Sequence, residues 1–291
     1  MWLLTLVLFA DTAHAFSVVL TPVESVQVTV TGAGEPVVLI PGLFGSAFGF
    51  RRVLPLLAQT GFHAVVVEPL GVGTSARPAR ADYSLTAQAD RVAAALDRLG
   101  LANAIVVAHA VGASIAYRLA YRRPDLVRGI VALDGGPVEA ATTRGFRRAL
   151  ELAPWIKLLG GARLVRRKLQ RSLIAASGDT TWVTEQVLDG YAAGAARDLD
   201  GTLRGYVAMA AAREPERLAP HLAEIRCPVR LVIGTAPHQS GVSAAEVSAL
   251  ARALASFVID SVAGAGHFLF EEQPAAVIAA VERIRSLGQW R

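Results

Sequence analysis

Short apolar runs alternate with amphipathic segments along most of this 291-residue chain. Continuous apolar runs predict strands buried on both faces of a sheet, and they lie at 36–40, 63–67, 104–107, 129–133 and 229–233. Further strands are predicted at 26–31 and 257–259, and helices at 48–59, 85–99, 112–120, 244–254 and 274–287. This alternation predicts an α/β fold with a doubly wound, mostly parallel sheet and right-handed crossovers.

One interval interrupts the alternation. Residues 137–217 contain no strand-like run and are typical of several short helices. An insertion of this kind after a strand is where a cap over a site would lie. We therefore predict an α/β core formed by residues 24–136 and 218–288, with a helical cap at 137–217 inserted into it.

The N-terminus has features of an export signal. Residues 2–10 are apolar, and Ala13-His14-Ala15 supplies the small-x-small pattern of a cleavage site. We predict a signal peptide at 1–15, cut after Ala15, and an exported protein, periplasmic or secreted. The alternatives are an N-terminal β-strand, or a start codon downstream of the real one, and a cytoplasmic protein.

Composition narrows the classes of partner. Hydrophobic residues make up 53% of the chain and charged residues 18%, as in a well-packed globular protein. The net charge is only +5, and no basic run is interleaved with aromatic residues, so nucleic-acid binding has no support. The single cysteine excludes an internal disulfide and a cysteine metal cluster. No cofactor or metal motif is present, and we predict none.

The most informative motif is the turn at His109-Ala110-Val111-Gly112. It follows one predicted strand and precedes a predicted helix, which is the setting in which a nucleophile elbow holds a serine above a sheet. The residue at the serine position is Ala110, whose methyl group can neither attack a carbonyl nor accept a proton.

Together with other segments, this turn resembles the α/β-hydrolase superfamily from about residue 24 to 287, in the capped branch of esterases, lipases and dehalogenases. The segment 41–46 resembles the oxyanion loop after the third strand, 68–75 the Gly-x-Gly-x-Ser loop after the fourth, and 264–268 the loop that carries the catalytic histidine. The resemblance implies His267 as that histidine, Ala110 at the nucleophile position, and oxyanion donors on Val111 and on Leu43 or Phe44.

The acid of a Ser-His-acid triad is missing from its usual place after the strand at 229–233, because residues 234–240 contain no Asp or Glu. Asp134 ends the preceding strand, and haloalkane dehalogenases carry their acid at a similar place. Asp134 is therefore either the partner of His267 or a turn residue that caps the Gly135-Gly136-Pro137 backbone. His109 and Glu68 are interpreted as structural, and Ser46 and Ser114 as candidates for a displaced nucleophile.

These observations leave three hypotheses. The first is a hydrolytically impaired protein of esterase or lipase ancestry that binds a small apolar ligand with an anionic or carbonyl head. The second is a cofactor-free enzyme of lyase, epimerase or oxygenase type with His267 as base, and the third is a hydrolase with a displaced nucleophile. Nine Lys and Arg residues against Glu151 alone at 140–172 form a basic part of the cap. It is either a solvated face or a surface for anionic ligands or an anionic membrane.

Overall fold

The computed structural model describes residues 13–142 and 161–287 of the chain. The strands are β1 His14–Val19, β2 Ser25–Thr31, β3 Glu35–Ile40, β4 Phe62–Glu68, β5 Ala104–His109, β6 Val127–Leu133, β7 Val229–Gly234 and β8 Phe257–Val262. The helices are η1 Ala47–Arg52, α1 Leu54–Gln59, α2 Leu85–Arg98, α3 Val111–Arg122, α6 Gly161–Ala176, α7 Glu185–Arg197, α8 Leu199–Ala211, η2 Ala219–Glu224, α9 Ala244–Ala253, α10 Leu269–Glu272 and α11 Pro274–Leu287.

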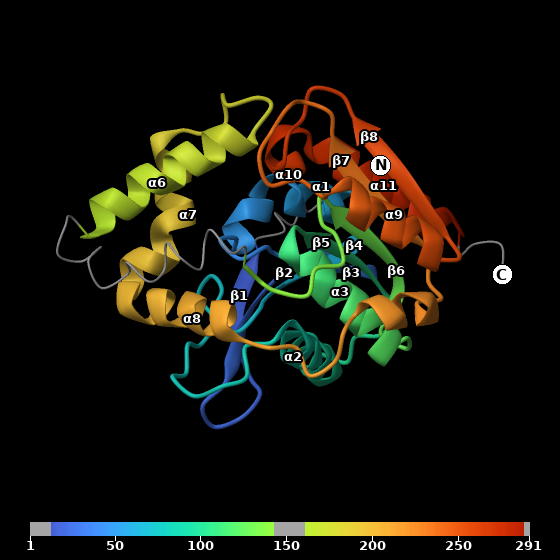
Figure 1. Ribbon diagram of the computed structural model, residues 1–291, viewed down its shortest axis with the longest axis horizontal. Helices are drawn as coiled ribbons and strands as arrows, with labels where there is room; N and C mark the ends of the chain where they lie inside the picture. Colours follow the sequence, from blue (N-terminus) through green and yellow to red (C-terminus); the bar gives the residue numbers. More distant parts are fainter. Residues whose placement is uncertain (1–12, 143–160, 288–291) are drawn as a thin grey trace, which may run out of the picture.

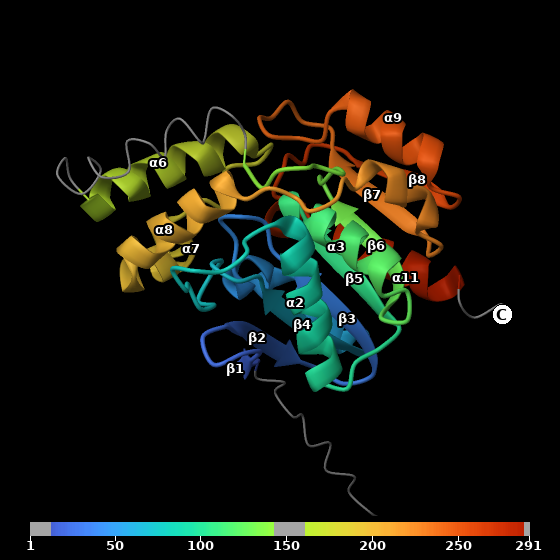
Figure 2. The same cartoon turned by 60° about the horizontal axis from the view of Figure 1, so that its bottom comes forward.

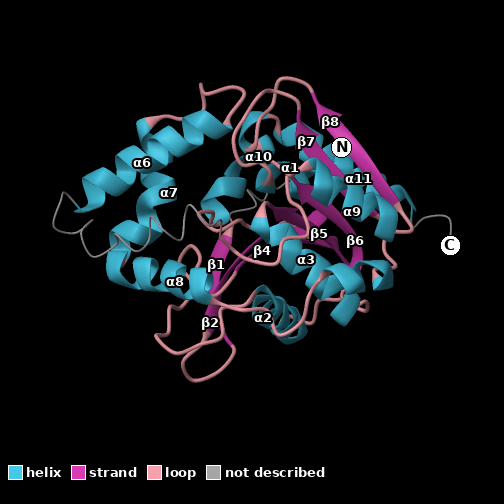
Figure 3. Cartoon of the chain, in the orientation of Figure 1, coloured by secondary structure: helices cyan, strands magenta, loops and turns pink. Residues whose placement is uncertain are grey.

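The strands form one eight-stranded sheet in the order β1-β2-β4-β3-β5-β6-β7-β8. The pairs β1–β2 and β2–β4 are antiparallel, and every pair from β4 to β8 is parallel. Helices cover both faces of the sheet, and Figures 1 and 3 show this layering. The predicted doubly wound α/β fold is confirmed.

Two hydrophobic clusters hold the layers together, and successive strand residues alternate between them. In β5, Val106 and Ala108 pack with residues of α2, α3 and α9 on one face. Ile105 and Val107 pack on the other face with residues of η1, α1 and α11. Because the central strands are buried on both sides, they are continuous apolar runs in the sequence.

Local signals fix several element boundaries. The side chain of Ser84 accepts a hydrogen bond from the Ala87 N–H at the start of α2, and Ser243 and Glu246 form a capping box at α9. The single helix predicted at 48–59 is wrong, because the segment divides at Val53 into η1 and α1. Pro55 lies in the first turn of α1, and a proline, which has no N–H, cannot continue a preceding helix.

The cap lies between β6 and β7 and includes α6, α7 and α8, which stand together beside the same end of the sheet in both views (Figures 1 and 2). Of the basic residues predicted there, Arg144, Arg147, Arg148 and Lys157 lie outside the described residues. Arg166 in α6 pairs with Glu185 and Asp189 of α7, so its charge serves contacts within the cap. A membrane-facing role of the basic cap stays a prediction.

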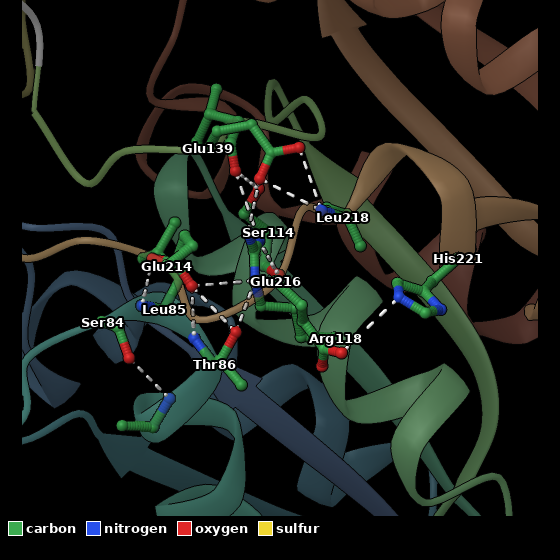
Figure 4. A network of polar contacts seen from close by, with 12 residues as sticks. Ser84, Leu85, Thr86, Ser114, Arg118, Glu139, Glu214, Glu216, Leu218 and His221 are labelled. Atoms are coloured by element: carbon green, nitrogen blue, oxygen red, sulfur yellow. Dashed lines mark hydrogen bonds and ion pairs between the residues drawn. The ribbon is translucent and has the colours of Figure 1, made fainter.

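A buried arginine ties both ends of the cap to the core. Arg118 of α3 contacts Glu139, at the entry to the cap, at 3.0 Å and Glu214, at its exit, at 3.4 Å. Glu214 also accepts hydrogen bonds from the N–H groups of Leu85 and Thr86 at the start of α2. Figure 4 shows Arg118 among Glu139, Glu214 and Thr86, which come from separate segments of the chain.

The predicted cleavage point after Ala15 lies inside β1, where Ala15 pairs with Thr29 of β2. Residues 2–10 of the predicted signal lie outside the described residues, so export stays a prediction. Within the described part of the chain, no helix has the length and apolar character that crossing a membrane requires.

Candidate functional site

The turn between β5 and α3 places Ala110 in a left-handed backbone conformation, with φ 51° and ψ −122°. Such a conformation costs a non-glycine residue about 1–3 kcal/mol and persists only where the surroundings impose it. Two glycines allow the tight packing that does so. A Cβ on Gly112 would lie 2.7 Å from the Ile40 carbonyl oxygen, and one on Gly135 would lie 2.4 Å from that of Ala110.

Asp134 and His267 meet beside this turn. His267 Nδ1 donates to Asp134 Oδ2 over 2.6 Å, and both residues are buried. Asp134 follows β6 with φ 44°, so it occupies the turn and also reaches the histidine. Of the two interpretations left open by the sequence, the side chain shows the contact with His267; among the described residues, the backbone N–H from which the carboxylate accepts is that of Val242 and not one of residues 135–137. Burial raises the pKa of Asp134. The hydrogen bond and the charge of His267 lower it, as do the hydrogen bonds from Val242 and His238, and together they leave that pKa below its usual range.

A second histidine, which the sequence did not single out, also contacts the carboxylate. His238, in the loop after β7, donates from Nε2 to Asp134 Oδ2 over 2.9 Å, and its Nδ1 lies 2.7 Å from the Ala236 carbonyl oxygen. Burial lowers the pKa of His238, but hydrogen bonds to Ala236 and Asp134 and the charges of Asp134 and Glu272 raise it overall. The strands β6 and β7 are parallel neighbours, so the loops that follow them lie at the same edge of the sheet. This adjacency is the signal that could have placed His238 beside Asp134.

Two of the residues interpreted as structural have structural contacts. His109 donates from Nε2 to the His267 carbonyl oxygen over 3.1 Å, and burial holds the pKa of His109 well below its usual range. Glu68 accepts hydrogen bonds from the N–H groups of Ala47 and Thr74, so it fixes the loops after β3 and β4. Burial raises the pKa of Glu68, and these hydrogen bonds, which lower it, do not fully offset the effect of burial.

The two candidates for a displaced nucleophile differ in their surroundings. The Ser114 hydroxyl is fully buried and lies 2.9 Å from the Val138 carbonyl oxygen and 3.1 Å from that of Gly136. It is thereby engaged in holding the entry to the cap. Ser46 precedes η1 and lines the cavity described next.

A cavity of about 890 Å³ lies between the core and the cap. Its wall includes Ala110, Asp134 and His267 from the ends of strands, and apolar or aromatic side chains from the core and the cap, among them Leu169, Leu173, Tyr191, Phe268 and Phe270. The wall also carries the polar side chains of His109, Glu139 and Glu246. A cavity of this size with a wall in which apolar side chains predominate is typical of a site for a small, mainly apolar molecule.

Backbone donors line the same cavity. Leu43, in the turn after β3, and Val111, the first residue of α3, both contribute to its wall. Across residues 13–142 and 161–287, neither of their N–H groups donates a hydrogen bond. Phe44, the other predicted donor, also lines the cavity, and its ring packs edge-on against Tyr206 at 5.1 Å. Unpaired donors at a helix N-terminus favour an anion or a carbonyl oxygen.

Asp134, His238 and His267 have ligand atoms within 4.8 Å of one another, which is the spacing of a metal site. However, the two histidine nitrogens lie 2.6 and 2.9 Å from the carboxylate oxygen. Tetrahedral zinc, with ligands at 2.0–2.1 Å, keeps them about 3.3 Å apart. The distances fit hydrogen bonds, so we assign no metal to this group.

Comparison with known proteins identifies the fold. Residues 35–165 match the sequence profile of the α/β-hydrolase fold family. The crystal structure of Cfl2 wild-type from Burkholderia cenocepacia superimposes with a TM-score of 0.76 at 24% identity, covering 94% of this chain and 95% of that one. The chain therefore has the α/β-hydrolase fold with a cap.

Two curated relatives are similar over part of the chain. A segment of 104 residues is 34% identical to bifunctional epoxide hydrolase 2 of Sus scrofa, covering 35% of this chain and 19% of that protein. A segment of 119 residues is 34% identical to 2-hydroxymuconate semialdehyde hydrolase of Pseudomonas sp. strain CF600, covering 40% and 41%. The matches span less than half the length of each relative.

Proposed function

We propose that this protein binds a small, largely apolar molecule through a carbonyl or anionic oxygen. The proposal rests on Leu43 and Val111, two residues of the cavity wall whose N–H groups have no acceptor among the described residues. A ligand oxygen placed between them satisfies both donors, and the cap side chains cover its apolar body.

Ala110 directs the proposal toward binding rather than covalent hydrolysis. Removing the nucleophile of a serine triad costs on the order of 10⁶ in kcat, about as much as removing the whole triad. The backbone donors do not depend on that side chain, and an oxyanion site with binding alone retains roughly 10³–10⁴ over water. Ser114 does not replace the nucleophile, since its hydroxyl is engaged with the backbone at 136 and 138.

We expect decanoate to raise the unfolding temperature more than decanol and much more than decylamine, because a carboxylate oxygen accepts stronger hydrogen bonds than a hydroxyl oxygen and an ammonium group accepts none. Saturation at a hundredfold excess over Kd contributes about 2.7 kcal/mol, which a thermal-shift assay detects. The matched variants are Leu43→Pro, which removes one N–H at a turn position suited to proline, and Leu43→Ala, which keeps it. The preference for decanoate should fall in the first variant only. Equal shifts for the three compounds would refute the proposal.

A second candidate function is general-base catalysis without a covalent intermediate, and the 2.6 Å contact between His267 and Asp134 favours it. Because Nδ1 faces the carboxylate, Nε2 is the ring nitrogen left for a ligand in the cavity. In this reaction Nε2 takes a proton from the carbon next to a bound carbonyl, and the electron pair moves onto the oxygen. The backbone donors then stabilise the resulting enolate.

Exchange of the α-protons of 2-nonanone in D₂O, followed by NMR, tests this candidate. We expect the protein to accelerate exchange, and His267→Gln to lose about 10²–10⁴ of that acceleration, the range that a positioned base contributes. The control His221→Gln alters a histidine on η2 that stacks on Tyr121 instead. If the wild type and His267→Gln exchange at the same rate, His267 is not a base for this chemistry.

A further inference from the structure

Asp134 is shared between two histidines, and only one of them belongs to the pair described above. His238 lies in the loop after β7, and its side chain is 9% exposed. Its ring is 6.2 Å from that of His267, centroid to centroid. His238 is not part of the cavity wall formed by the described residues, so it acts through Asp134 rather than on a ligand.

The partners of His238 determine its charge. Both ring nitrogens face groups that only accept hydrogen bonds, the Ala236 carbonyl at Nδ1 and the Asp134 carboxylate at Nε2. A neutral imidazole carries one N–H, so it would leave a lone pair directed at one of these oxygens. An imidazolium satisfies both, and it also has an opposite charge 2.9 Å away.

The surroundings are consistent with that charge. The titratable groups around the ring are Asp134 at the end of β6, His267 in the loop after β8, and Glu272 in α10, and two of these three are acidic. Asp134 is held from a third direction, because its Oδ1 accepts from the Val242 N–H over 3.1 Å. The carboxylate is thereby fixed in the orientation that meets His267.

We propose that His238 is a positively charged positioning residue that orients Asp134 for His267 and offsets its negative charge beneath the cavity. The consequence, which rests on the proposed binding function, is selectivity. Without the imidazolium, the buried carboxylate would repel an anionic ligand head. With it, the site admits carboxylates as well as neutral carbonyl compounds.

The charge itself is tested on the unliganded protein, independently of any ligand. Histidine-ring ¹⁵N NMR should show both nitrogens of His238 protonated, and Asp134→Asn should shift its titration midpoint to lower pH, because the variant removes the partner charge. A neutral ring with a single protonated nitrogen, or a midpoint unaffected by Asp134→Asn, would overturn the proposal even if the protein binds ligands.

The selectivity is tested by calorimetry with decanoate and decanol. We expect His238→Gln to weaken decanoate at least about tenfold, because one uncompensated charge within about 12 Å contributes a factor of roughly ten or more at an effective dielectric constant near 20, and to leave decanol nearly unchanged. Gly241→Ala provides a second variant, because a Cβ there would lie 2.9 Å from His238 Nε2 and displace the ring. The control is His221→Gln. Equal weakening of both ligands would show that His238 is only structural.

Discussion

Ala110→Ser is expected to convert this protein into a measurable esterase. The backbone at Ala110 already has the left-handed conformation of a tight strand-to-helix turn, and the residue faces the cavity beside His267 and Asp134. The substitution adds one oxygen to a site in which His267 and Asp134 are already in contact. We expect turnover of short-chain p-nitrophenyl esters to rise about 10²–10⁴-fold above the parent protein, because the new hydroxyl gives a positioned base a group to activate; this is less than the order of 10⁶ that the nucleophile of a complete serine triad contributes.

The same variant also tests the choice of acid. Replacing the aspartate of a serine-protease triad by asparagine lowers kcat about 10⁴-fold, because the histidine is held in the wrong tautomer. Adding Asp134→Asn to Ala110→Ser should therefore return activity to the parent level. Ser114→Ala is the matched control, since its hydroxyl is buried against backbone carbonyls, and it should leave the new activity intact.

A fluorophosphonate probe separates this outcome from a displaced nucleophile. The parent protein should not be labelled, and Ala110→Ser should be labelled at residue 110. Stoichiometric labelling of the parent at Ser46 or Ser114 would contradict the assignment and identify a hydrolase with its nucleophile elsewhere. An active Ala110→Ser variant that tolerates Asp134→Asn would show that Asp134 is not the orienting acid.

The sequence predicted the strands and capped helices because their signals are local. The run at 104–107 is buried on both faces in the structure, and Ser84 and Ser243 cap the helices that they were expected to start. The strand β1 was given only as an alternative to the signal peptide and without bounds, because it is mostly exposed and is defined by its pairing with β2. Pairing partners are a tertiary feature that periodicity does not contain.

The site was partly predictable for a related reason. Family motifs located His267 and the turn at Ala110, but they left Asp134 open between two roles. His238 was missed because a single histidine in a loop has no pattern of its own. Its contact with Asp134 joins residues 104 positions apart and depends on the adjacency of β6 and β7 in the sheet.

The cap depends on a group that sequence patterns also do not reveal. Arg118 is fully buried, which is rare for an arginine and is tolerated only with paired charges and saturated hydrogen bonds. Besides Glu139 and Glu214, it contacts the Thr86 hydroxyl at 3.2 Å and the Val138 carbonyl at 3.3 Å. One side chain thus joins α3, the start of α2 and both connections to the cap.

Arg118→Leu is therefore expected to lower the free energy of unfolding by about 3–5 kcal/mol, because it leaves the Glu214 carboxylate, which is 8% exposed, and the partly exposed Glu139 carboxylate without their counter-charge. Arg122→Leu, one helical turn further along α3, is the matched control. Arg122 pairs with Asp90 and Glu216 at a side-chain exposure of 34%, where an ion pair contributes about 0–1 kcal/mol. Urea unfolding of both variants measures the difference in the free energy of unfolding. Adding Glu214→Gln to Arg118→Leu should recover part of the lost stability, because it removes the carboxylate charge that has lost its partner. Equal costs at positions 118 and 122 would mean that the network does not stabilise the attachment of the cap, and the cavity would then owe its shape to the apolar contacts of the cap alone.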